Sequence, residues 1–267
     1  MHRCSLAHLS LLDATPPQLV AAAGAAGFRH VGLRLHPARP GEVPHPMHEG
    51  SPMLAETHAR MADLGVAVHD VEVIRLHAGF DASRFDGLLA VSASLGARYL
   101  VVNGDDDEAP RAAASLAALA ERAAPYGLAV GLEFMVYTAV PTLDAACTLV
   151  RRAAQPNARV LIDTLHFARS GARPAMLDGR EEVARDFAQI SDAPAARHPA
   201  LSPGEEARAH RLLPGEGELP LSAIVAALSP DAVLSVEAPS SVRRHHLGLA
   251  QRAALAWRAA QDWRSAA

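Results

Sequence analysis

The stretch Val160-Leu161-Ile162-Asp163-Thr164-Leu165-His166-Phe167 ends an apolar run on a carboxylate and places an imidazole three residues later. Residues 160–162 are continuously apolar, as in a strand covered on both faces, and Asp163 is the first charge. The pattern predicts a buried strand that carries a functional side chain at its C-terminal end. The alternative is an aspartate that only caps a following helix, because Asp is a favoured N-cap residue.

Three other apolar runs end on an oxygen donor in the same way. Residues 129–133 end on Glu133, residues 187–192 contain Gln189, and residues 232–237 end on Glu237. About one βα unit separates successive donors, except for a longer polar segment at residues 192–220. We therefore predict an α/β fold, a single (β/α)8 TIM barrel with a parallel eight-stranded sheet, whose strand C-termini share one mouth.

Strand and helix patterns alternate along the rest of the chain, which favours a parallel sheet. Strands are expected at residues 4–9, 30–35, 66–76 and 99–102, and a short helical region at 173–184. The Pro-, Gly- and His-rich residues 37–52 are either a lid or, more simply, a solvated connector. The acidic run 105–108 is interpreted as a helix N-terminus rather than a metal site.

The length and charge of the chain limit its architecture and its partners. The 267 residues suit one barrel domain spanning 1–267. A net charge of −4 gives no basic footprint for nucleic acid or an anionic membrane. No apolar stretch is long enough to span a bilayer and no signal peptide is evident, so we expect a cytoplasmic protein. A homodimer is left open.

Cysteine and lysine usage exclude several kinds of chemistry. Cys4 and Cys147 are the only cysteines, which supports neither a disulfide framework nor a CxxC site. The sequence has no lysine, so all 25 residues counted as Lys+Arg are arginine. Schiff-base aldolases, pyridoxal-phosphate enzymes and P-loop proteins need a lysine and are therefore excluded.

Carboxylates that converge at a barrel mouth would repel one another without a cation, whereas a divalent ion turns that repulsion into coordination. We therefore expect a metal site formed by Glu133, Asp163, Gln189 and Glu237. Oxygen ligation favours Mn²⁺ or Mg²⁺, with Zn²⁺ or Co²⁺ as alternatives. We expect His166 to contact the substrate, or to contact the ligand side chains from behind, instead of binding the metal directly.

These motifs, together with Gln189-Ile-Ser-Asp192-Ala-Pro and Arg211-Leu-Leu-Pro-Gly215-Glu-Gly217, resemble the xylose isomerase-like TIM barrels. That group includes sugar phosphate isomerases and epimerases, inosose dehydratases, 3-dehydroshikimate dehydratases and endonuclease IV. The resemblance implies the same four metal ligands, with His166 and either Arg208 or Arg211 on the substrate. Glutamine at position 189 is similar to the dehydroshikimate dehydratases, but their histidine shortly after the strand-five glutamate is missing here. The net charge and ligand set argue against the endonucleases.

The expected reaction is proton transfer at a carbon next to a carbonyl of a small polyhydroxylated substrate, with Glu133 and Glu237 as candidate bases. Return of the proton gives a sugar (phosphate) isomerase or epimerase, which is the function we predict. Loss of a β-hydroxyl gives a dehydratase of the 3-dehydroshikimate or inosose type, which is the first alternative. A non-catalytic ligand-binding barrel is the second.

Overall fold

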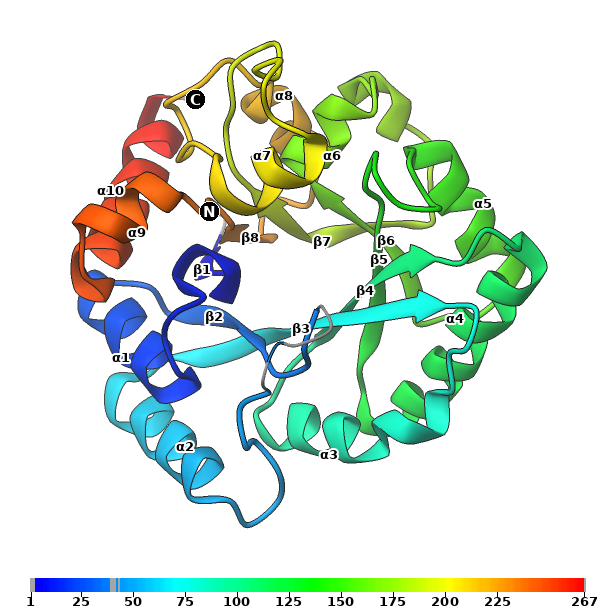
Figure 1. Ribbon diagram of the computed structural model, residues 1–267, viewed down its shortest axis with the longest axis horizontal. Coiled ribbons are helices and arrows are strands. Elements are labelled where there is room, and N and C mark those ends of the chain that lie inside the picture. The colour runs from blue at the N-terminus through cyan, green and yellow to red at the C-terminus, as the bar shows by residue number, and fades with distance from the viewer. Residues whose placement is uncertain (1–2, 39–41, 43, 267) are drawn as a thin grey trace.

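A computed structural model describes residues 3–38, 42 and 44–266. Within that part of the chain, eight strands pair in parallel in sequence order, and β8 pairs with β1 to close the barrel (Figure 1). The strands are β1 (Arg3–Leu6), β2 (His30–Arg34), β3 (Ala67–His77), β4 (Tyr99–Asp105), β5 (Ala129–Glu133), β6 (Ala158–Asp163), β7 (Val183–Ile190) and β8 (Val233–Val236). The predicted TIM barrel is confirmed.

Helices follow the strands and form the outer layer of the molecule (Figure 1). The α-helices are α1 (Pro16–Ala26), α2 (Pro52–Leu64), α3 (Asp86–Ser94), α4 (Ala109–Ala123), α5 (Leu143–Ala153), α6 (Thr164–Arg169), α7 (Pro203–Ala209), α8 (Leu221–Ala226), α9 (Ser241–His246) and α10 (Leu249–Ala266). Short 3-10 helices are η1 (His8–Leu11), η2 (Ala82–Phe85), η3 (Ala124–Tyr126) and η4 (Pro174–Leu177). Among the described residues, no helix has the length and apolar character needed to cross a membrane.

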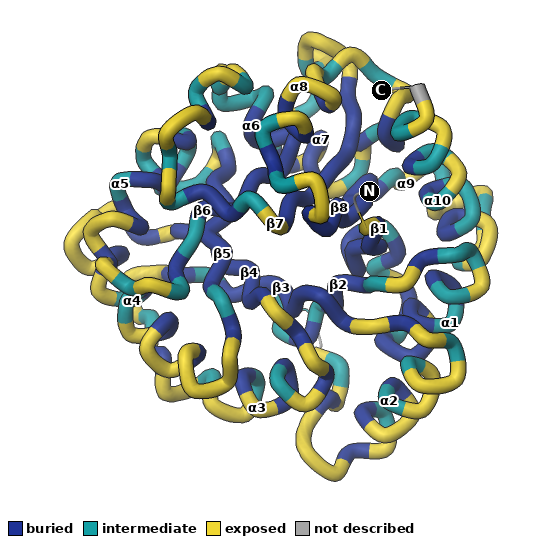
Figure 2. Tube along the Cα trace, turned by 180° about the vertical axis from the view of Figure 1, so that it is seen from behind, coloured by how far each residue is buried: buried dark blue, intermediate teal, exposed yellow. Residues whose placement is uncertain are grey.

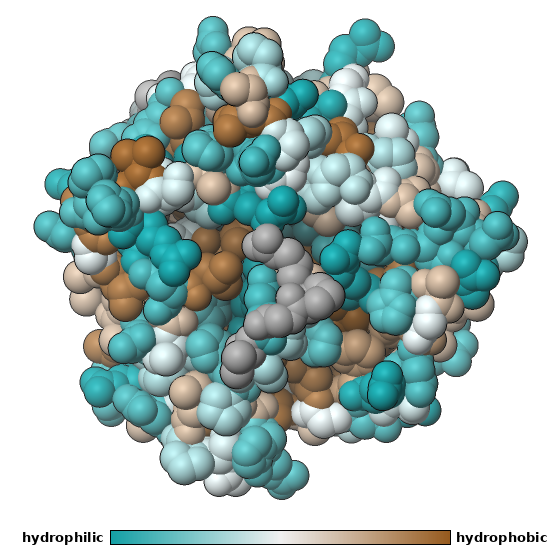
Figure 3. Space-filling model, in the orientation of Figure 1, coloured by the Kyte–Doolittle hydropathy of each residue, from teal (hydrophilic) through white to brown (hydrophobic). Residues whose placement is uncertain are grey.

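The strands carry the core, because their side chains are enclosed by the barrel interior on one face and by helices on the other. Val160, Leu161 and Ile162 of β6 are fully buried, as the continuous apolar run predicted. Figure 2 shows the same contrast along the chain, with buried strands at the centre and helices exposed on their outer sides. On the face seen in Figure 1, hydrophilic residues are interspersed with hydrophobic patches (Figure 3).

Three expected elements differ from the structure, and one of them is the fourth strand, which continues past residue 102 to Asp105. The helical region predicted at residues 173–184 is limited to η4, and Val183 already belongs to β7, where it pairs with Val160. Pro174 and the left-handed Gly179 confine the helix to one turn. The first strand ends at Leu6, earlier than expected, because residues 8–11 turn into η1.

Two loops bear on earlier expectations. Residues 39–41 and 43 lie outside the described part of the chain, so the choice between a lid and a solvated connector for residues 37–52 falls partly there. Of the acidic run 105–108, Asp105 ends β4 and Glu108 is the N-cap residue of α4, so the run leads into the helix as predicted. In it, Asp106 accepts the Glu108 N–H at 2.9 Å and pairs with Arg111 at 2.6 Å, which gives this carboxylate a local structural role.

Candidate metal and substrate site

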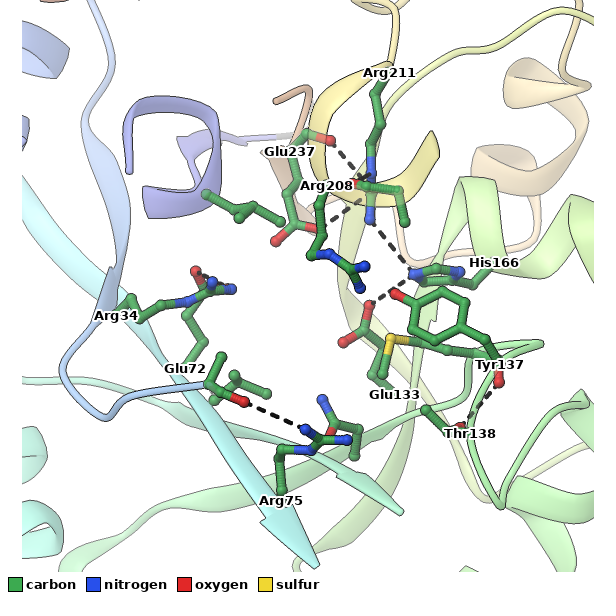
Figure 4. A pocket seen from close by; sticks show the side chains of 16 residues that line it. Arg34, Glu72, Arg75, Glu133, Tyr137, Thr138, His166, Arg208, Arg211 and Glu237 are labelled. Carbon is green, nitrogen blue, oxygen red and sulfur yellow. Dashed lines mark hydrogen bonds and ion pairs between the residues drawn. The ribbon is translucent and has the colours of Figure 1, made fainter. Parts of the chain in front are cut away.

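The four predicted donors come from neighbouring strand ends at the barrel mouth. Glu133 and Asp163 are the last residues of β5 and β6, Gln189 lies in β7, and Glu237 directly follows β8. The register places Asp163 beside Gln189, and all four side chains are buried. Glu133 and Glu237 line one cavity together with His166 (Figure 4).

Asp163 uses both of its carboxylate oxygens. Oδ1 accepts the backbone N–H of His166 at 3.0 Å and so caps α6, while Oδ2 accepts Nη1 of Arg211 at 2.5 Å. Asp163 therefore caps α6, and its other oxygen contacts Arg211 at the candidate site. The adjacent Thr164 hydroxyl bonds both the carbonyl and the N–H of Ser191, at 2.8 and 2.9 Å, which ties the ends of β6 and β7.

The donor set fits a divalent cation. Glu133, Asp163 and His166 each offer a ligand atom, and these atoms lie within 4.8 Å of one another. Gln189 Nε2 donates to Glu237 Oε1 at 2.9 Å, while the buried Oε1 of Gln189 has no hydrogen-bond partner among the described residues. Carboxylates, an amide oxygen and an imidazole are ligands that divalent metals take. His166 thus stands closer to the candidate ligands than sequence alone indicated.

Arg211 is the cation that the structure places among these acids. Its side chain is 2 % exposed, and its Nη1 lies 2.5 Å from Asp163 Oδ2 and 3.2 Å from Glu237 Oε2. Its Nε donates to the Ala207 carbonyl at 2.7 Å, and its Nη2 lies 3.5 Å from His166 Nε2. Several acceptors therefore fix one guanidinium against two candidate ligands.

The electrostatics of the site favour an added positive charge. Burial, and next the charge of Asp163, raise the pKa of Glu133 to about 8. Burial also raises the pKa of Glu237 well above its ordinary value. For Asp163 burial acts in the same direction, but Arg211 and His166 outweigh it and lower the pKa. Burial lowers the pKa of His166 to about 4. A bound cation would let these carboxylates ionise together.

Other side chains that the sequence analysis did not assign to the site line the same cavity (Figure 4). They are Arg34, Glu72, Arg75, Asn103, Met135, Tyr137 and Thr138. Both Glu72 and Arg75 belong to β3, but only Arg75 lies near its C-terminal end, whereas Glu72 lies in the middle of the strand. Tyr137 lies in the loop between β5 and α5, with its ring 5.6 Å from that of His166, and no strand-end pattern marks it.

The two arginines proposed for the substrate occupy different positions. Arg211 is buried among the acids, whereas Arg208 is exposed at the mouth, with its guanidinium carbon 5.8 Å from the centre of the Tyr137 ring. Both line the cavity. The segment 192–220, which follows β7, therefore contributes both Arg208 in α7 and Arg211 just after α7 to the site.

Comparison with known proteins gives one family and several relatives. The model of a family described as xylose isomerase-like TIM barrel matches residues 20–265. The 3-dehydroshikimate dehydratase of Pseudomonas aeruginosa is 30 % identical over 235 residues, which are 83 % of this chain and 35 % of that protein. The chain thus spans about a third of the length of this curated relative.

Solved structures with low identity share the fold. The zinc-bound IolI protein is 17 % identical, with a TM-score of 0.79 over 99 % of this chain and 98 % of that one. A D-psicose 3-epimerase crystallised with D-fructose is 14 % identical, with a TM-score of 0.71 over 98 % of each chain. At such identities the likeness shows the architecture alone.

Proposed function

Because the chain belongs to the xylose isomerase-like TIM barrel family, we propose that it is a divalent-metal enzyme that moves a proton at a carbon next to a carbonyl. The substrate is a small polyhydroxylated compound. The observation that carries this proposal is the position of two buried glutamates, Glu133 and Glu237, on one cavity beside Asp163 and Gln189. Such a site can bind adjacent oxygens of a hydroxycarbonyl compound and still present a carboxylate to the neighbouring C–H.

Glu133, Asp163, Gln189 and Glu237 would hold the metal, with His166 near enough to take part. We propose Mn²⁺ or Mg²⁺, with Zn²⁺ or Co²⁺ as alternatives, because most of these donors are oxygens. When bound, the cation polarises the carbonyl and stabilises negative charge on its oxygen, which is worth several kcal/mol.

The residues of the chain supply the proton transfer. Glu133 or Glu237 removes the proton, since both are buried and both line the cavity. Arg211 positions Asp163 and Glu237 through its 2.5 and 3.2 Å contacts. The ring of Tyr137 meets that of His166 edge-on, with the ring centres 5.6 Å apart, and both residues line the cavity.

The step that follows removal of the proton decides which reaction takes place. If the second glutamate returns the proton, the substrate is isomerised or epimerised, and the presence of two candidate bases supports this outcome. If a β-hydroxyl leaves instead, the substrate is dehydrated. The Pseudomonas aeruginosa relative, a 3-dehydroshikimate dehydratase, favours this second candidate.

The test is to incubate the protein with Mn²⁺ and either 3-dehydroshikimate or D-fructose in D₂O, and to follow both products and deuterium uptake by NMR. Deuterium uptake at carbon reports proton removal even when no net product forms. Glu133→Gln and Glu237→Gln should each lower the rate by at least about 10², the usual contribution of a general base.

Dehydration of the first compound or epimerisation of the second would decide between the candidates. Thermal stabilisation by both compounds without exchange or product would instead identify a ligand-binding barrel. Unchanged turnover in both glutamine variants would rule out the assigned bases, whatever the substrate.

A further inference from the structure

One layer of the barrel interior is polar, whereas TIM barrels usually fill such layers with branched apolar side chains. Side chains alternate between the two faces of a strand, so Val233, Ser235 and Glu237 all point inward. Glu237 lines the cavity at the mouth, and Val233 packs with Phe187 in a cluster of strand residues at the floor. Ser235 therefore lies between the acids of the mouth and the apolar floor.

Ser5 and Asp70 belong to the same layer. Ser5 of β1 pairs in register with Ser235 of β8, so the two side chains lie on the same face of strands that are about 4.8 Å apart. On β2, Gly32 comes two residues after His30, which is the partner of Ser5. A Cβ atom added to Gly32 would lie 2.8 Å from Oδ1 of Asp70 and closer still to Oδ2. The lack of a side chain at Gly32 thus lets the Asp70 carboxylate enter the layer.

The three polar side chains of this layer are fully buried and unpaired. Asp70, Ser5 and Ser235 are each 0 % exposed. Neither carboxylate oxygen of Asp70 and neither serine Oγ has a hydrogen-bond partner among the residues that the structure describes. Buried polar groups are normally hydrogen-bonded, so three unpaired neighbours in one layer indicate that a group from outside the chain binds between them.

The charge of Asp70 is not offset by the residues around it. Glu72, two residues further along β3, pairs with Arg34 through a contact of 3.3 Å. Burial lowers the pKa of the adjacent His69 to about 3, so its ring is neutral at pH 7. Within the described ranges, the Asp70 carboxylate has no cationic partner. A buried charge left in this way is costly, and a counterion would remove the cost.

A single cation would satisfy the whole layer. It offsets the carboxylate and takes the two serine oxygens as ligands, since hard cations bind oxygen. One uncompensated negative charge matches a monovalent ion better than a divalent one. A proton on Asp70 would remove the charge but leave the hydroxyls unpaired, and a water molecule would pair the hydroxyls but leave the charge.

We propose that Asp70, Ser5 and Ser235 form a buried site for an alkali cation, Na⁺ or K⁺, one layer below the candidate divalent site. The bound ion places a fixed positive charge beneath the acids of the mouth and joins β1, β3 and β8 across the barrel interior. The site is separate from the proposed function, because it uses none of the four candidate metal ligands.

The test is the melting temperature of the protein, with Mn²⁺ at one fixed concentration, as NaCl or KCl replaces tetramethylammonium chloride at constant ionic strength. Tetramethylammonium carries the same charge, but its methyl groups keep oxygen ligands away from it. The melting temperature should rise with Na⁺ or K⁺ and then level off, by about 3–6 °C at ten times the dissociation constant. The salt that acts at the lower concentration identifies the preferred ion.

Variants of the three side chains locate the effect. Asp70→Asn should abolish the rise. In tetramethylammonium it should melt at or above the wild-type temperature, because the amide has no charge to offset. Ser5→Ala and Ser235→Ala should each increase the salt concentration needed for half of the rise, since each removes one ligand oxygen.

The controls alter buried residues of the same types whose partners belong to the protein. Asp106 pairs with Arg111 at 2.6 Å, and the Ser92 hydroxyl donates to the Leu88 carbonyl at 2.7 Å. Asp106→Asn and Ser92→Ala should lower the melting temperature in every salt and still show the wild-type rise with Na⁺ or K⁺.

Equal melting temperatures in all three salts would overturn the proposal, as would a rise that persists in Asp70→Asn. If Asp70→Asn does not fold, an unchanged rise in the double variant Ser5→Ala/Ser235→Ala overturns it instead. Mn²⁺ binding and deuterium uptake at carbon judge the proposed function, so either proposal can fail without the other.

Discussion

Arg211 is the clearest single residue whose role follows from its surroundings. It lies 2 % exposed between Asp163 and Glu237, and removing one partner of a buried ion pair leaves the other charge uncompensated. We expect Arg211→Gln to lower the free energy of unfolding by about 3–5 kcal/mol, measured by urea denaturation. The loss arises from two stranded carboxylates, not from altered packing.

A matched control is Arg122→Gln, because Arg122 pairs with Asp86 at 2.8 Å on the surface, where both side chains are about half exposed. Such a pair contributes about 0–1 kcal/mol. Equal destabilisation by the two variants would refute the role given to burial at Arg211.

At the scale of residues, only part of the site is predictable from the sequence. Glu133 and Asp163 could be placed because each ends a local apolar run, and parallel strands bring such ends together. Tyr137 could not be found this way, because its contact with His166 is made through space from a loop.

At the scale of elements, the segment 192–220 was recognised as too long for an ordinary connection, but its anchor was not visible in the sequence. Asp192 is that anchor. Oδ1 accepts the N–H of Ala193 at 2.8 Å and of Leu219 at 3.0 Å, while Oδ2 accepts those of Gly215 at 3.1 Å and Gly217 at 2.9 Å. One carboxylate thus fastens the turn after Arg211 to the end of β7.

We expect Asp192→Asn to loosen this turn, since an amide offers one acceptor oxygen and its NH₂ faces the donors. The variant should lose about 2–3 kcal/mol of stability, the cost of leaving buried donors unpaired. Hydrogen exchange at Gly215, Gly217 and Leu219 should accelerate more than exchange in the barrel strands. Asp178→Asn, in an exposed turn, serves as the control, and uniform acceleration throughout the molecule would contradict a local clamp.

At the scale of the whole molecule, buried ionisable groups give opposing dependences on pH. Burial raises the pKa of Asp70 well above its ordinary value, and neither of its carboxylate oxygens has a hydrogen-bond partner in the described part of the chain. This group stabilises the fold at low pH, and the contribution is lost as the pH rises through its folded-state pKa. Burial lowers the pKa of His8 to about 4 and that of His69 to about 3. The stability that these two histidines contribute is therefore lost as the pH falls. The contribution of a single group to the free energy of unfolding is therefore measured best as the difference between wild type and variant.

His8 suits that measurement because the neutral ring is bonded on both sides. Its Nδ1 accepts the Arg34 N–H at 2.9 Å, so Nε2 carries the proton and donates to the Ala14 carbonyl at 2.9 Å. The folded pKa of about 4 lies below the ordinary 6.5, so the unfolded chain takes up a proton first as the pH falls. The stability contributed by His8 is thus complete above about pH 6.5 and is lost toward pH 4. We expect His8→Gln to cost most at pH 8, and the cost to shrink by about 2–3 kcal/mol by pH 4.5, at about 1.4 kcal/mol for each unit. Urea unfolding of wild type and variant at pH 8 and pH 4.5 gives the cost of the substitution at each pH. A cost that stays constant with pH would mean that the folded protein binds a proton at His8 as readily as the unfolded chain does.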